Sequence, residues 1–230
     1  MKYILTVIFC LLSLHVFPQL MSYSEWQEQA KSNINMQPEY GNVKKTSEQI
    51  EADNSLIKLA IAEEGTARKA SEHFVQLGFK YLYSGDIIAA MSRFNQAWLL
   101  DKSNENAYWG YGAVYFTFLD AESAIKQYDK GLTINPASSI ILTDKATVYY
   151  IKYQQEQGQD KMKLTTAINL LNSSYKIDSV NRNTLFKLSV CYFLAEDCVN
   201  AKKYYEACAK LAGGQLDPQY AAALSARCGK

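Results

Sequence analysis

Few side chains of this sequence are suited to acid–base or metal chemistry. Its two histidines are His15 and His73, and His15 lies in an apolar stretch near the start of the chain. Nucleophilic catalysis or metal binding needs further bases or ligands at fixed spacings from a histidine, and no such His–Cys or His–Glu spacing is present. The sequence therefore predicts no enzyme, no metal site and no cofactor.

The fragment Gly110–Tyr111–Gly112 resembles part of a nucleotide-binding loop. Such loops follow a β-strand and begin a helix, whereas these glycines lie inside a segment with helical periodicity. We interpret them as helix-packing residues. No small-molecule substrate is evident from the sequence either.

Four cysteines lie in the last fifth of the chain, namely Cys191, Cys198, Cys208 and Cys228. Cys198 is expected to begin one helix and Cys228 to end another, so the two meet if those helices are antiparallel. We predict a Cys198–Cys228 disulfide, with Cys191–Cys228 as the competing pair and four reduced thiols as the alternative. Cys208 is expected to be a packed thiol.

The composition is typical of a globular helical protein. Of the 230 residues, 48% are hydrophobic and 20% charged, and the chain has 17 Tyr but only 4 Pro. The formal net charge of +1 gives no bulk attraction to nucleic acid or anionic lipid. The sequence predicts no nucleic-acid partner.

The beginning of the chain has the character of a targeting segment. An apolar run, Ile4–Phe17, follows a short basic start; it has the length of a signal-peptide core and is shorter than the roughly 20 residues of a membrane span. We predict a signal peptide over 1–19, cut near Gln19, and a periplasmic or secreted protein. The alternatives are an uncleaved membrane anchor and lipidation at Cys10, which the bulky Phe9 disfavours.

A repeat of 34 residues determines the expected architecture. The segment Phe74–Tyr81 reads FVQLGFKY and its counterpart Tyr108–Tyr115 reads YWGYGAVY. Each is followed in register by a second segment of helical periodicity. Over residues 71–138 this pattern resembles the tetratricopeptide repeat (TPR), a pair of antiparallel helices. The resemblance implies an all-α fold, a right-handed α-solenoid of about four helical hairpins.

The first helix of each hairpin must approach the second closely. We expect Gly78 and Gly112 in the first helices to meet Ala90 and Ala124 in the second helices. Gly85 is expected to end a helix and the following aspartate to cap the next one.

Weaker copies of the repeat follow. Over residues 69–230 the expected TPR domain comprises repeats at about 71–104, 105–138, 139–181 and 182–214, and a capping helix at 217–228. The third repeat has nine extra residues within Lys152–Lys163, with Gly158 as the expected turn. This insertion is interpreted as a tolerated extension at an exposed edge, with a binding element as the alternative.

Residues 20–68 do not repeat. A short helix is expected to begin near Ser24, followed by irregular chain. Thr46–Gln49 fits a capping box, so a second helix is expected from there to about Gly65. We interpret this region as an N-terminal arm and an extra helix packed on the first repeat.

The TPR resemblance implies a groove lined by the first helices of successive hairpins. The positions inferred to line it carry aromatic and apolar residues. The candidate partner-binding residues are Val75, Phe79, Tyr83, Trp109, Phe116, Tyr150, Phe186 and Phe193, with Leu82, Asn106, Thr143, Thr147, Asn183 and Val190 beside them. Relatives that clamp acidic chain ends use Lys, Arg and Asn in the groove, and this sequence lacks that set.

An apolar groove has two interpretations. It binds a hydrophobic helix or an extended polypeptide of a partner, or the protein's own arm fills it, with Trp26 or the segment Ile50–Ile61 lying across it. The expected function is a protein–protein interaction scaffold of the cell envelope, resembling exported TPR proteins of Bacteroidetes-type bacteria, with an unknown polypeptide partner. The alternative is a structural component that self-associates or belongs permanently to an envelope complex. Membrane contact is expected only through the signal segment, if it is not cleaved.

Overall fold

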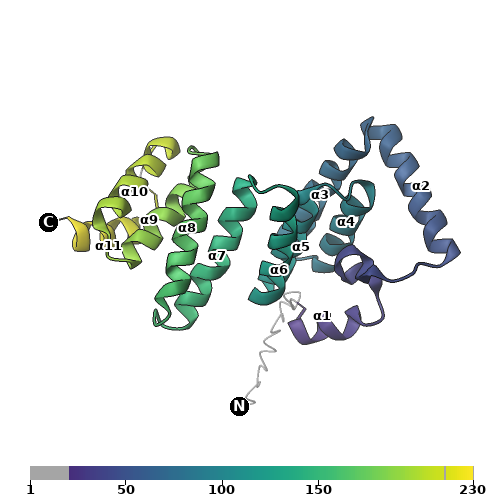
Figure 1. The fold of residues 1–230 in the computed structure, drawn as a ribbon, viewed down its shortest axis with the longest axis horizontal. Coiled ribbons are helices and arrows are strands. Elements are labelled where there is room, and N and C mark those ends of the chain that lie inside the picture. The colour runs from purple at the N-terminus through teal and green to yellow at the C-terminus, as the bar shows by residue number, and fades with distance from the viewer. Residues whose placement is uncertain (1–20, 215, 230) are drawn as a thin grey trace, which may run out of the picture.

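The computed structural model describes residues 21–214 and 216–229, and within these residues the protein is built from helices and turns without a β-strand (Figure 1). The predicted signal peptide and its cleavage site lie outside the described residues. None of the described helices has the length and apolar character needed to cross a membrane.

The helices follow one another with short connections. Their bounds in chain order are α1 (Tyr23–Ala30), the 3-10 helices η1 (Ile34–Met36) and η2 (Pro38–Asn42), α2 (Ser47–Glu64), α3 (Ala67–Tyr83), α4 (Ile87–Leu100), α5 (Glu105–Thr117), α6 (Ala121–Ile134), α7 (Ser139–Gln155), α8 (Lys161–Ile177), α9 (Arg182–Leu194), α10 (Cys198–Ala212) and α11 (Pro218–Cys228).

Four hairpins, α3–α4, α5–α6, α7–α8 and α9–α10, stack in a row (Figure 1). Each second helix packs on the first helix of the next hairpin, and the first helices α3, α5, α7 and α9 also contact one another in turn. The first helices therefore form one continuous face, which we call the inner face. This is the all-α solenoid that the repeat pattern predicts.

Aspartate caps define where the second helices begin. Asp86, Asp120, Asp160 and Asp197 each accept a hydrogen bond from a backbone N–H in the first turn. In the first hairpin the residue before the cap is Gly85, with φ 85°, a backbone conformation that suits glycine. This agrees with the expected Gly–Asp turn.

Aromatic rings of the second helices pack against the glycines of the first helices. The space beside Gly78 is occupied by the ring of Phe94, and the space beside Gly112 by the ring of Tyr128. A Cβ at either glycine would overlap the ring. The glycines must therefore be small because an aromatic ring of the second helix needs the room, a partner that the expected contact with Ala90 and Ala124 did not include.

The segment of residues 22–42, which we call the strap, packs on α4 of the first hairpin and reaches the second hairpin through side-chain contacts. Its Trp26 is buried, with 2% of its surface exposed, and lies 5.4 Å from the ring of Phe118. Its two ends are joined to the solenoid through pairs with the second hairpin, Tyr23 with Asp120 and Glu39 with Lys130. The strap thus ties two hairpins together.

A buried asparagine of α4 holds the backbone of the strap. The side-chain amide of Asn95 donates to the carbonyls of Asn35 and Gln37, at 2.9 and 3.0 Å. Its carbonyl oxygen accepts from the backbone N–H of Tyr40 at 3.3 Å and from the hydroxyl of Tyr111 at 2.8 Å. All the hydrogen-bonding capacity of this amide is used, as a buried amide requires.

Helix α2 begins at a capping box formed by Thr46 and Gln49, as predicted, and ends before Gly65. It packs on α3 and α4 through a small cluster around Ala60, Ala70 and Leu100. Both the strap and α2 lie at the opposite end of the row from α9 (Figure 1).

The third hairpin is the longest. Helices α7 and α8 have 17 residues each, whereas α5 has 13 and α6 has 14. The inserted residues extend both helices and their connecting turn, which contains Gly158 at φ 77°.

Candidate partner-binding site

The predicted groove residues on the first two hairpins include Val75, Phe79 and Trp109. These side chains largely cover one another. Val75 and Phe79 are 6% and 9% exposed. The ring of Phe79 lies 4.0 Å from that of Trp109, and Trp109 Nε1 donates to Asp144 Oδ2 at 2.7 Å. This part of the inner face is filled by its own aromatic side chains.

The remaining predicted residues differ in their surroundings. Tyr83 is 80% exposed at the end of α3. Phe116 is partly buried against the cluster that contains Tyr128. Phe193 is partly covered by α11, with the ring of Tyr220 at 5.7 Å and the guanidinium of Arg227 at 5.1 Å.

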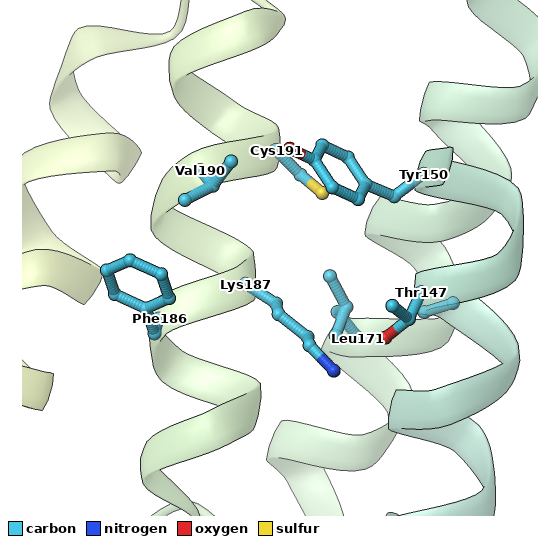
Figure 2. A pocket seen from close by; sticks show the side chains of 8 residues that line it. Thr147, Tyr150, Leu171, Phe186, Lys187, Val190 and Cys191 are labelled. Carbon is cyan, nitrogen blue, oxygen red and sulfur yellow. The ribbon is translucent and has the colours of Figure 1, made fainter. Parts of the chain in front are cut away.

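Tyr150 and Phe186 border an apolar hollow of about 160 Å³ between α7 and α9 (Figure 2). Its lining comes from three helices: Ala146, Thr147 and Tyr150 of α7, Leu171 of α8, and Phe186, Lys187, Val190 and Cys191 of α9. We call it the α7–α9 hollow. The strap and α2 lie at the other end of the row, so the alternative in which Trp26 or the segment Ile50–Ile61 lies across the groove does not hold at Tyr150 and Phe186.

The repeat register explains why the hollow exists at this hairpin. Leu171 stands at the position of Phe94 and Tyr128 in the first two hairpins. Those two rings fill the space between neighbouring helices, whereas Leu171 is shorter and branched. Thr147 likewise stands where Phe79 stands in the first hairpin. Two aromatic rings of the first hairpin are thus replaced by smaller side chains.

Lys187 is the charged residue of the lining. Its Nζ lies 3.8 Å from Asp144 Oδ1, and the two side chains are 24% and 29% exposed. Burial lowers the pKa of Lys187, and the carboxylate of Asp144 offsets part of that shift. Figure 2 shows the lysine side chain extending across the hollow from α9 toward α7.

Cys191 contributes a thiol to the floor of the hollow. It is 1% exposed, and burial raises the pKa of this thiol to about 12. At neutral pH the group is therefore a neutral thiol that behaves as an apolar packing group. It offers no nucleophile to a bound molecule.

The other cysteines lie at the C-terminal end. Cys198 and Cys228 form a disulfide that joins the start of α10 to the end of α11, with their Cα atoms 5.3 Å apart. Cys191 and Cys208 are free and buried, and the thiol of Cys208 donates to the carbonyl of Arg182 at 3.3 Å. The competing Cys191–Cys228 pairing is not formed.

Sequence reasoning identified part of this site. It named Tyr150 and Phe186, with Thr147 and Val190 beside them, and missed Ala146, Leu171, Lys187 and Cys191. A comparison of equivalent positions would have shown that Leu171 replaces an aromatic residue. Within the described residues no group of three or more His, Cys, Asp or Glu side chains is placed to hold a metal ion.

Comparison with solved structures identifies the fold. A thermophilic TPR protein of Thermus thermophilus is similar with a TM-score of 0.56 and 16% identity, over 68% of this chain and 80% of that one. The Cut9–Hcn1 hetero-tetramer of the APC/C contains a chain that is similar with a TM-score of 0.52 and 17% identity, over 90% of this chain and 38% of that one. The protein thus has the fold of a TPR solenoid. No family model matches the sequence, and no curated protein is detectably similar to it.

Proposed function

We propose that this protein is a non-enzymatic scaffold that binds a polypeptide partner on its inner face, at the α7–α9 hollow. The observation that carries the proposal is an apolar hollow bordered by Tyr150 and Phe186 on the face that the first helices share. Concave apolar sites with a few polar groups are where proteins bind ligands. The Cut9–Hcn1 structure, which contains a similar chain, is a hetero-tetramer, which is consistent with a partner-binding role for such a solenoid.

Export to the periplasm or beyond the cell belongs to the same proposal, as does the likeness to exported TPR proteins of Bacteroidetes-type bacteria. The apolar segment Ile4–Phe17 supports it. The Cys198–Cys228 disulfide also supports it, because such bonds persist in oxidising compartments.

A second candidate function is assembly with further copies or within a larger complex. It is favoured by apolar residues at the ends of the second helices. Ile134, Ile177 and Leu211 occupy equivalent positions and are 39%, 45% and 44% exposed. They lie along one edge of the row and not on the inner face.

Selection of peptides from a random displayed library on the purified protein tests the first proposal. Tyr150→Arg places a charged side chain at the hollow, whereas Met162→Arg changes a residue of α8 that is 79% exposed. We expect the selected peptides to bind Tyr150→Arg at least about tenfold more weakly, because an unpaired charge replaces apolar contact, and to bind Met162→Arg unchanged. Equal binding to both variants, or no selected peptide, would contradict the proposal.

A further inference from the structure

The α7–α9 hollow lies where two aromatic rings of the first hairpin have smaller counterparts. In the first hairpin the rings of Phe79 and Phe94 fill the space between neighbouring first helices, and their centroids are 5.1 Å apart. In the third hairpin the equivalent residues are Thr147 and Leu171. The rest of the lining differs as well: Ala146 and Lys187 stand where Gly78 and Gly110 leave room for the ring of Phe94. The hollow is the part of that volume that these side chains, Thr147 and Leu171 do not fill.

The volume of the hollow agrees with this comparison. It holds about 160 Å³, and an apolar protein cavity of roughly 150 Å³ accommodates benzene. The hollow thus has the size of one phenyl or phenol ring, whereas a helix, which is about 10 Å across, is too wide to enter. Tyr150 and Phe186 both line the hollow. The ring of Phe186 also packs edge-on against Tyr220 of α11, with the centroids 5.5 Å apart, so Tyr150 is the aromatic residue available to contact an inserted ring.

The ammonium of Lys187 favours a bound molecule that carries a carboxylate next to its aromatic ring. The ammonium of Lys187 is mostly withdrawn from water, and its nearest carboxylate, on Asp144, is 3.8 Å away. That carboxylate already accepts the N–H of Trp109 through its other oxygen. A second carboxylate at hydrogen-bond distance would improve the pairing of Lys187, because charge-assisted bonds of this kind are short and strong.

We propose that the α7–α9 hollow binds an aromatic side chain of the partner polypeptide while an adjacent Asp or Glu of that polypeptide pairs with Lys187. The inference rests on the proposed function and names the residues that the partner must supply. We take an internal acidic side chain as the source of the carboxylate, because the proposed partner is a polypeptide whose aromatic side chain is held at the same site.

The test uses peptides of one length, acetylated and amidated at their ends so that the side chain is the sole carboxylate. The probes contain Phe–Glu, Phe–Gln or Ala–Glu in an otherwise Gly/Ser sequence, and 3-phenylpropionate serves as a small probe. Binding to the purified protein is followed by the methyl NMR signals of Leu171 and Val190. We expect Phe–Glu to bind about tenfold more tightly than either of the other peptides.

Two variants fill the hollow with rings that this chain already uses. Thr147→Phe introduces the residue of the first hairpin at that position, and Ala146→Gly with Leu171→Phe reproduces the Gly78–Phe94 pair. Both are expected to abolish binding of the Phe–Glu peptide while the circular dichroism spectrum stays helical. Lys187→Met is expected to make Phe–Glu and Phe–Gln bind equally, and Lys176→Met, at an exposed site of α8, to change nothing.

The outcomes separate the two proposals. Peptides that bind at Tyr150 but show no preference for Phe–Glu, or that still bind Thr147→Phe, would overturn the inference and leave the scaffold function standing. The scaffold function would be overturned by two results together: the selection yields no peptide that binds the inner face, and 3-phenylpropionate binds specifically to the native protein but not to Thr147→Phe. The hollow would then be a small-molecule site.

Discussion

Trp109 and Asp144 are joined by a hydrogen bond of 2.7 Å between Nε1 of the indole and Oδ2 of the carboxylate. The tryptophan belongs to α5 and the aspartate to α7. Because the other oxygen of Asp144 faces Lys187 on α9, one carboxylate connects three successive first helices. The stacking of hairpins is therefore fixed by a polar link as well as by apolar packing.

Replacing Asp144 by Ala should destabilise the protein by about 2–4 kcal/mol, because it leaves the half-buried Lys187 ammonium and the indole N–H without their acceptor. Urea denaturation followed by circular dichroism measures the change. Glu122→Ala, at an exposed site of α6, is the matched control. A loss no greater than that of the control would show that the carboxylate does not hold the helices together.

Asn95→Ala should release the strap. The substitution removes the amide that binds the backbone at Asn35, Gln37 and Tyr40, and we expect a loss of about 2–4 kcal/mol from backbone groups left unpaired. Hydrogen exchange should accelerate over residues 22–42 and remain unchanged in α9 and α10. Uniform acceleration across the chain would instead indicate that the hairpins do not unfold separately.

The Cys198–Cys228 bond should stabilise the C-terminal cap. The disulfide closes a separation of 30 residues, for which loop entropy predicts about 3–4 kcal/mol. In a Cys198→Ser/Cys228→Ser variant we expect faster hydrogen exchange in α11, with α3 unaffected. Adding a thiol reductant to the native protein should reproduce this pattern, and adding it to the variant should have no effect.

The stability of the protein should decline at alkaline pH because several tyrosines are neutral in the fold. Burial raises the pKa of Tyr220 from 10.0 to about 12, with smaller effects from neighbouring groups, and raises those of Tyr111 and Tyr128 well above the ordinary value. A raised folded pKa means that stability is fully present below pH 10 and is lost as the pH rises through about 12. The prediction is checked by measuring the urea concentration at the midpoint of unfolding from pH 8 to 12. In the Tyr220→Phe variant we expect this midpoint to fall less steeply with pH.

The repeat pattern was sufficient to predict the solenoid because its signal comes from helix periodicity and from small residues at fixed spacing, both of which are local. Gly78 illustrates the limit: the sequence shows that space is needed, but not that Phe94 takes it. The hollow was only partly foreseen, since it results from the absence of a ring at Leu171 and depends on comparing three helices at once. The course of the strap depends on pairings between residues far apart, such as Tyr23 with Asp120, which no local pattern encodes.

The strap also affects the order in which the protein can fold during its synthesis. Residues 22–42 leave the ribosome before the solenoid does, but their partners on α6 include Lys130, which is separated from Glu39 by 91 positions. Until that part of the chain has emerged, Trp26 and Met36 have no complete surface on which to bury their side chains. A nascent chain of intermediate length therefore presents an aromatic and a thioether side chain to solvent, and factors that bind unfolded chains could recognise it there.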